Sequence, residues 1–292
     1  MQLAKINNTI HNLPTGLRRT FHMRFTNSAL TFTAIAVLFA AIPVHAATCS
    51  YSFTAGKAGY FQGGDYMQYC ITANGTFANF QSPATTEMIN QDGAYEGYGI
   101  CELGGNYSYY DYGDEGNSGN WSAPTLVKQT TSEVVISRST ADGRWTLVQT
   151  ITEVPGPPPY AKVTMTLENG TGYVTEVVLI RYARFVPSDA GGSGNYKENY
   201  DSTVGSTFGY TGEWTGNGGN AFGLMLQNVG FPSPNSSDDF WLAWVANTWT
   251  GPAPCGEPNV SSTIINGIGS GFLSYHVVVH RSATVTARYM SF

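Results

Sequence analysis

The chain has 292 residues, of which 42% are hydrophobic and 12% charged, and its formal net charge is −6. All 20 acidic residues but only ten of the 14 basic ones follow residue 47, so residues 48–292 carry a net charge of −10. An acidic chain without a basic run argues against nucleic acid and anionic membrane surfaces as partners.

Residues 1–47 have the features of a secretory signal peptide. A basic residue, Arg24, precedes an apolar run at 29–42, and a small-residue cleavage site follows at Ala46. Met23 is a plausible true start, and the alternative is a longer basic segment that begins at residue 1. Because the apolar run is shorter than the roughly 20 residues that span a bilayer, we expect a secreted or periplasmic protein with no membrane insertion after signal removal.

The chain after the signal is predicted to consist of strands, with few helix signals. In the first half, strands are expected at 49–54, 66–72, 76–80, 97–103 and 106–112, separated by Gly- and Tyr-rich turns.

The stretch 133–186 is predicted to form a four-strand antiparallel meander with turns at Asp142-Gly143, at a proline-rich segment and at Asn169-Gly170. Its last strand, 173–186, is apolar on both faces at 177–180, so we expect it to lie between two layers.

Two segments follow the meander. Residues 187–220 form a long Gly-rich stretch of the kind that is often functional. Residues 270–280 and 282–291 are predicted to form a closing hairpin. Together these patterns predict one domain at 48–292: an all-β, large antiparallel two-sheet sandwich with long central strands.

All four cysteines lie after the signal, and an even number in an exported chain predicts two disulfides. Of the three pairings we expect Cys70–Cys101, which closes a local loop, and Cys49–Cys255, which ties the N-terminus to a proline-rich loop. A zinc site is the less favoured alternative, because no C-x-x-C pair is present.

The long-strand segments Arg144–Ile151, Ala161–Asn169 and Val177–Arg184 resemble the core of the galactose-mutarotase-like supersandwich, which recurs in carbohydrate-active enzymes. The chain also resembles secreted bacterial β proteins with similar segments at Phe80–Pro83 and Glu96–Cys101. The first resemblance implies a supersandwich-like fold. Neither resemblance implies a particular activity.

Acidic residues beside aromatic ones are candidates for sugar binding, because sugars stack on aromatic faces and carboxylates bond their hydroxyls. They are Glu96, Asp111 with Tyr112, and Glu213 beside Trp214. Arg181 and Arg184 are candidates for binding the carboxylate of an acidic sugar. The alternatives are solvated turn residues and arginines paired with local acids.

One acidic loop is a candidate metal site. Its oxygen-bearing side chains are Asp111, Asp114, Glu115 and Asn117, a set of hard ligands that suits calcium. The spacing does not match an EF-hand, and a plain acidic loop is the alternative. No organic cofactor is expected.

No residue pattern indicates a catalytic class. There is no G-x-S-x-G motif and no phosphate-binding loop, and His276 and His280 lie too far apart along one strand to share a metal. We therefore favour a non-catalytic protein that binds a polysaccharide or other glycan at the cell exterior. The alternatives are a supersandwich-type epimerase, lyase or hydrolase, and a structural or adhesive surface protein.

Overall fold

The computed structural model describes residues 48–56, 66–82, 87–89, 95–105, 107–156, 158–185, 196–201, 206–211, 222–230, 240–246, 254–255, 264–266 and 270–291. Within these residues the chain is all-β, apart from one 3₁₀ turn, η1 (Gly113–Glu115). The predicted signal peptide lies outside them. No helix of the described part is both long and apolar enough to cross a bilayer.

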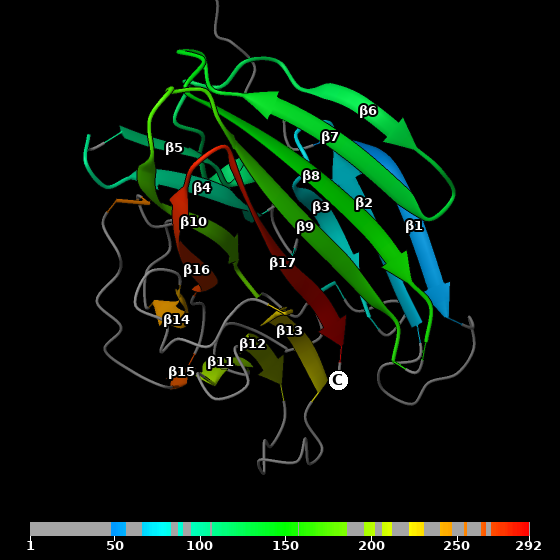
Figure 1. Ribbon diagram of the computed structural model, residues 1–292. Helices are drawn as coiled ribbons and strands as arrows, with labels where there is room; N and C mark the ends of the chain where they lie inside the picture. Colours follow the sequence, from blue (N-terminus) through cyan, green and yellow to red (C-terminus); the bar gives the residue numbers. More distant parts are fainter. Residues whose placement is uncertain are drawn as a thin grey trace, which may run out of the picture. The chain divides into compact units, whose positions relative to one another are not determined.

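The described strands form three antiparallel sheets (Figure 1). The smallest has the order β1 (Cys49–Gly56), β2 (Tyr66–Thr72), β3 (Phe77–Gln81). The middle one has the order β14 (Phe240–Ala246), β16 (Ser270–Val279), β10 (Thr175–Ala183), β4 (Glu96–Glu102), β5 (Tyr107–Asp111). The largest has the order β15 (Ile264–Asn266), β11 (Tyr196–Asp201), β12 (Ser206–Thr211), β13 (Phe222–Asn228), β17 (Ser282–Ser291), β9 (Tyr160–Asn169), β8 (Trp145–Val154), β7 (Glu133–Ser139), β6 (Thr125–Gln129).

The all-β sandwich and the strand positions in the first half are confirmed, with boundaries shifted by at most two residues. Strand β10 is covered on both faces, as its apolar sequence predicts. Leu179 packs into the main core between the sheets, whereas its neighbour Val178 packs on the opposite face with Cys101, Tyr112 and other buried residues.

The predicted four-strand meander is wrong in its last strand. Strands β7, β8 and β9 do form a meander, but β10 crosses into the middle sheet, where it pairs with β4 and β16. The predicted C-terminal hairpin is wrong for the same reason, because β16 and β17 belong to different sheets. Strand β17 instead pairs with β9. Alternation identifies a strand and its buried face, but it does not identify the strand's partner.

These two sheet-to-sheet crossings meet at one corner of the sandwich, held by Asn169. Its backbone N–H donates to the carbonyl of Arg281 (2.8 Å), and its side-chain amide donates to the carbonyl of Val279 (2.9 Å). The same amide donates to the carbonyl of Tyr173 (2.7 Å). One side chain therefore fixes both crossings and the loop between β9 and β10.

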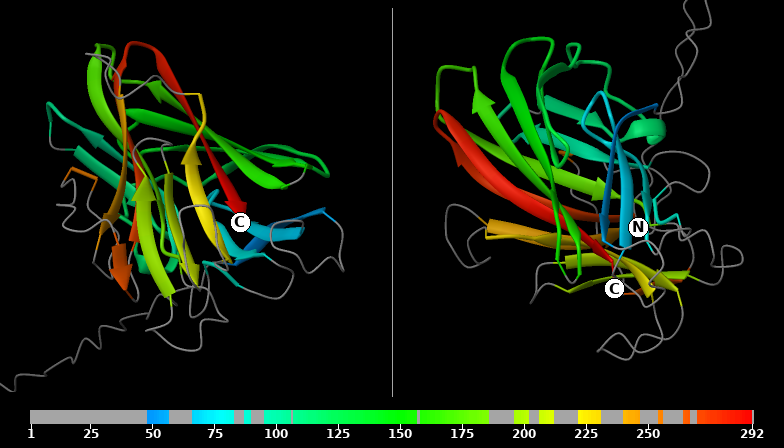
Figure 2. Two further views of the ribbon diagram at one scale, coloured as in Figure 1. Left: turned by 90° about the horizontal axis from the view of Figure 1, so that it is seen from below. Right: turned by 90° about the vertical axis from the view of Figure 1, so that its right-hand side faces the viewer.

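The small sheet lies against the large one (Figure 2). The Phe77 ring of β3 lies 4.7 Å from the Tyr289 ring of β17, centre to centre. The β2–β3 turn at Asn74 and Gly75 reaches into the interior, where both carbonyls accept hydrogen bonds from side chains of the other two sheets.

Both disulfides form, but the expected pairing is wrong. Cys49 bonds Cys70, with Cα atoms 5.5 Å apart, and Cys101 bonds Cys255, with Cα atoms 4.9 Å apart. Cys49 and Cys70 lie on the adjacent strands β1 and β2, whereas Cys101 lies on β4, in a different sheet from Cys70. The pairing of β1 with β2 brings Cys49 and Cys70 together, whereas Cys70 and Cys101 are kept apart in different sheets.

Candidate functional site

Four arginines each form an ion pair with a carboxylate in or beside the interior. The pairs are Arg138–Asp111, Arg144–Glu102, Arg181–Glu96 and Arg184–Glu115. They include four of the residues that the sequence singles out as ligand-binding candidates. At the sequence level the acids considered as partners of Arg181 and Arg184 are Asp189 and Glu198, whose side chains lie outside the described part of the structure.

Glu96 and Arg181 are fully buried where all three sheets meet. Arg181 Nε lies 2.5 Å from Glu96 Oε1, which also accepts a hydrogen bond from the Tyr289 hydroxyl. Phe77 N–H donates to the other carboxylate oxygen (2.7 Å), and Arg181 donates to Gln149 (2.7 Å). Burial raises the pKa of Glu96, against the opposing effects of Arg181 and these donors. Neither side chain reaches solvent, so both hold the sheets together rather than contact a ligand.

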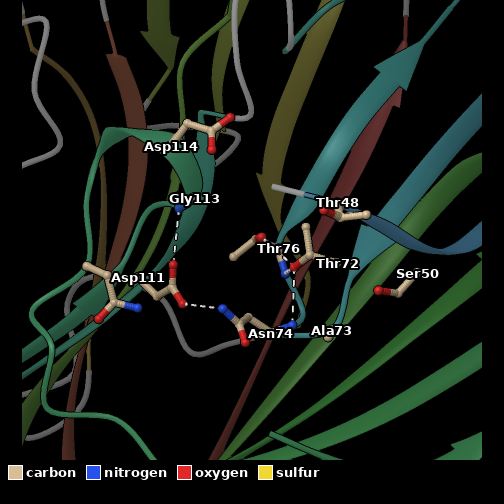
Figure 3. A pocket seen from close by; sticks show the side chains of 10 residues that line it. Thr48, Ser50, Thr72, Ala73, Asn74, Thr76, Asp111, Gly113 and Asp114 are labelled. Atoms are coloured by element: carbon tan, nitrogen blue, oxygen red, sulfur yellow. Dashed lines mark hydrogen bonds between the residues drawn. The ribbon is translucent and has the colours of Figure 1, made fainter. Parts of the chain in front are cut away.

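Asp111 lies at the edge of a polar pocket of about 330 Å3 (Figure 3). Asn74 and the hydroxyls of Thr72 and Thr76 line it from the β2–β3 turn, and Asp114 from the η1 side. Among the described residues, its lining includes no aromatic side chain. The Asp111 carboxylate accepts from Arg138, from the Asn74 amide (2.9 Å) and from Gly113 N–H (3.2 Å). These donors leave Asp111 little capacity for a ligand.

Of the predicted calcium ligands, Glu115 and Asp111 are both paired with arginines. Glu115 accepts from Arg184 and from the Tyr182 hydroxyl. Asp111, Asp114 and Asn117 line the polar pocket together. In the described part of the chain, no three or more His, Cys, Asp or Glu side chains gather as a metal site would require. The calcium site therefore stays a prediction from the sequence.

The remaining sequence candidates are placed as follows. Tyr112 is buried and stacked on Tyr110, with ring centres 5.1 Å apart. Arg184 is mostly buried, and its guanidinium lies 4.3 Å from the centre of the Tyr95 ring. Glu213 and Trp214 lie outside the described residues.

A second pocket, of about 410 Å3, lies beside the crossing corner, and we call it the tyrosine pocket. Its lining residues are Glu102, Gly104, Gly105, Tyr107, Arg144, Tyr173, Val174, Thr175 and Glu176. Tyr107 and Tyr173 are 45% and 56% exposed. Exposed aromatic rings in a concave site are the groups that ligands use for stacking.

Arg144 organises this pocket. Its Nε donates to Glu102 Oε2 (2.9 Å), and its Nη2 donates both to Glu102 Oε1 and to the Tyr173 hydroxyl (2.7 Å for the latter). The guanidinium carbon lies 4.3 Å from the Tyr107 ring centre and 5.9 Å from the Tyr173 ring centre. The hydrogen bonds to Glu102 raise the pKa of Arg144, so the guanidinium stays charged and both rings are held around it.

Three connections converge to build the tyrosine pocket. Glu102 and Tyr107 flank the β4–β5 turn, Arg144 precedes β8, and Tyr173 lies between β9 and β10. Gly170 allows the loop that carries Tyr173 to approach the segment that carries Arg144. Its N–H donates to the Arg144 carbonyl (2.8 Å). A side chain would not fit at this position, because a Cβ would lie 2.4 Å from the Gly143 carbonyl oxygen.

Two hydrogen bonds hold the backbone of the loop at Tyr173 in place. Its carbonyl accepts from Asn169 (2.7 Å) and from the Thr171 hydroxyl (3.0 Å). A loop fixed in this way loses little conformational entropy when a ligand binds. Sequence reasoning missed this pocket. The available signal was the Asn169–Tyr173 turn, in which a large aromatic side chain stands among small polar residues.

Comparison with solved structures shows that the fold is similar to that of galactose-mutarotase-like supersandwich domains. A bacterial glucoamylase in complex with acarbose is similar over 85% of this chain and 32% of that one, at 8% identity and a TM-score of 0.51. The chain thus spans about a third of the length of that enzyme. Two further similar structures are a putative aldose 1-epimerase from Escherichia coli (8% identity, 83% and 99% coverage, TM-score 0.42) and a heparan sulfate lyase from Pedobacter heparinus (10%, 78% and 33%, 0.41).

At these identities the similarity establishes the fold alone. No protein-family model matches the chain, and no curated protein sequence does either.

Proposed function

We propose that this protein is a non-catalytic, extracytoplasmic glycan-binding protein whose ligand occupies the tyrosine pocket. The observation that carries the proposal is the pair of half-exposed rings, Tyr107 and Tyr173, held around the Arg144–Glu102 ion pair at an open 410 Å3 pocket.

The chemistry of this pocket suits a sugar ring. The apolar face of a pyranose stacks on tyrosine rings, while its hydroxyls require donors and acceptors at the edge of the stack. Tyr107 and Tyr173 supply the faces. The Arg144 guanidinium, the Tyr173 hydroxyl and the Glu176 carboxylate supply polar atoms. The polar pocket around Asn74 lacks the aromatic faces and is the weaker candidate.

A binding role is favoured over catalysis by the state of the carboxylates. Glycoside chemistry uses an acid and a base or nucleophile that are free to exchange protons or attack. In the tyrosine pocket Arg144 neutralises Glu102, which leaves Glu176 as the single unpaired carboxylate among the described lining residues, where such chemistry uses two. Glu96, Asp111 and Glu115 are likewise paired with arginines. A carboxylate held in such a pair is a poor proton carrier.

The fold supports a role with carbohydrates, and the cysteines support a location outside the cytoplasm. The supersandwich fold recurs in proteins that act on carbohydrates, and a glucoamylase is among the similar structures. Two disulfides are typical of proteins outside the cytoplasm, and the predicted signal peptide agrees with export.

The test is a glycan array probed with residues 48–292, followed by titration calorimetry with the strongest ligand. Tyr107→Ala and Tyr173→Ala should each weaken binding by roughly tenfold or more, because each removes one stacking face. Tyr173→Phe keeps the ring and should retain more affinity than Tyr173→Ala.

Val127→Ala is the matched control, since Val127 is exposed on β6 and is not among the residues that line the pocket. Equal affinity in wild type and both tyrosine variants would refute the pocket. Release of reducing sugar or of an unsaturated product from the bound glycan would refute the non-catalytic role.

A further inference from the structure

The charges that line the tyrosine pocket indicate which class of glycan it accepts. This inference rests on the proposed function. The charged groups among its lining residues are Arg144, Glu102 and Glu176. Arg144 makes two hydrogen bonds to Glu102, whose side chain is only 4% exposed. Arg144, the positive charge among the described lining residues, is therefore already matched by Glu102.

Glu176 is the unmatched charge of the lining. It occupies the one exposed position of β10, whose other residues are buried. The described lining residues thus sum to a net charge of −1, on a chain whose residues 48–292 carry −10. An anionic ligand would meet a like charge at contact distance, and Arg144 would have to leave Glu102 to compensate it.

From this pattern we propose that the tyrosine pocket binds uncharged sugar units and rejects sugars that carry carboxylate or sulfate groups. This differs from the sequence-level expectation that Arg181 and Arg184 bind an acidic sugar. Both of those arginines are buried and paired with Glu96 and Glu115. Selectivity for uncharged sugars then arises because Glu176 repels anionic groups, while the tyrosine rings stack on a sugar without requiring a charge.

The experiment compares neutral and acidic oligosaccharides of equal length by calorimetry. The neutral probes are maltohexaose, cellohexaose and xylohexaose, and the acidic ones are hexagalacturonate and a heparin-derived hexasaccharide. We expect a neutral probe to bind, and we expect this binding to require Tyr107 and Tyr173. Its affinity should change little between low and high salt, because the ligand carries no charge for salt to screen. Glu176→Lys should strengthen binding of the acidic probes by roughly tenfold.

Glu133→Lys is the control. It makes the same change in net charge at the opposite end of β7 from the pocket, and it should not change acidic binding. Tyrosine-dependent binding of an acidic probe by the wild type would overturn the selectivity while leaving the proposed function standing. Absence of tyrosine-dependent binding to either class would overturn both.

Discussion

Arg181 and Glu96 form an ion pair in which both side chains are fully buried, 2.5 Å apart, where the three sheets meet. Strands β4 and β10 supply the pair, β17 supplies Tyr289, and the β2–β3 turn supplies the carbonyl of Gly75. This contact, rather than a ligand, accounts for two of the residues that the sequence marks as site candidates.

Removing one partner should destabilise the fold strongly. Arg181→Met keeps much of the side-chain volume but leaves the Glu96 carboxylate buried and unpaired, so we expect a loss of about 3–5 kcal/mol in the free energy of unfolding. Urea denaturation with intact disulfides measures it. The double variant with Glu96→Gln should recover part of the loss. A single variant within about 1 kcal/mol of wild type would contradict this role.

The pH dependence of stability tests the state of Glu96. Burial raises its folded-state pKa above the ordinary value of 4.5. The folded protein therefore holds this proton more tightly than the unfolded chain, and the associated stability is present below the ordinary pKa and lost as pH rises through the raised one. As pH rises from the ordinary pKa through the raised pKa of Glu96, the free energy of unfolding of wild type should fall relative to that of Glu96→Gln. A relative gain would mean that Arg181 outweighs burial.

A buried residue of β10 and an outward-facing residue of β9 give a packing test. Leu179 is fully buried in the main core, so Leu179→Ala should cost roughly 2–5 kcal/mol. Thr166 lies on the outer face of β9, and its hydroxyl is within hydrogen-bonding distance (3.0 Å) of that of Thr284. Thr166→Ala should stay within about 0.5 kcal/mol of neutral. Urea unfolding of both variants decides, and equal costs would show that the assignment of faces is wrong.

The disulfide pairing is open to direct mapping. Non-reducing peptide mapping should recover Cys49 linked to Cys70 and Cys101 linked to Cys255. The second bridge closes 154 residues and the first only 21. On the chain-entropy model, replacing Cys101 and Cys255 by alanine should therefore destabilise the protein by about 2 kcal/mol more than replacing Cys49 and Cys70. Recovery of a Cys70–Cys101 peptide would contradict the structure.

Much of the fold is predictable from local pattern. Alternating apolar and polar residues predict the strands β7, β8 and β9. The run in β10 that is apolar on both faces correctly predicts a strand between two layers. The sheet partners are not predictable in this way. The β9–β10 and β16–β17 connections look like hairpin turns in the sequence, yet both cross between sheets, and hydrogen bonds from Asn169 link the two crossings.

The site is less predictable than the fold. An arginine or glutamate beside tyrosines looks the same in sequence whether it is exposed or sealed in the core, as Glu96 and Arg181 illustrate. Tyr107 and Tyr173 are 66 positions apart in the chain and share a pocket only because β4 pairs with β10 and Gly170 permits close approach to the loop before β8. Long-range pairing of this kind leaves no local signature.

The most direct test of the central claim is a crystal structure of the protein with the strongest glycan from the array. We expect a sugar ring stacked on Tyr107 or Tyr173, with a hydroxyl within hydrogen-bonding distance of Arg144 or Glu176. A sugar bound instead in the polar pocket around Asn74 and Asp111, with the tyrosine pocket empty, would contradict it.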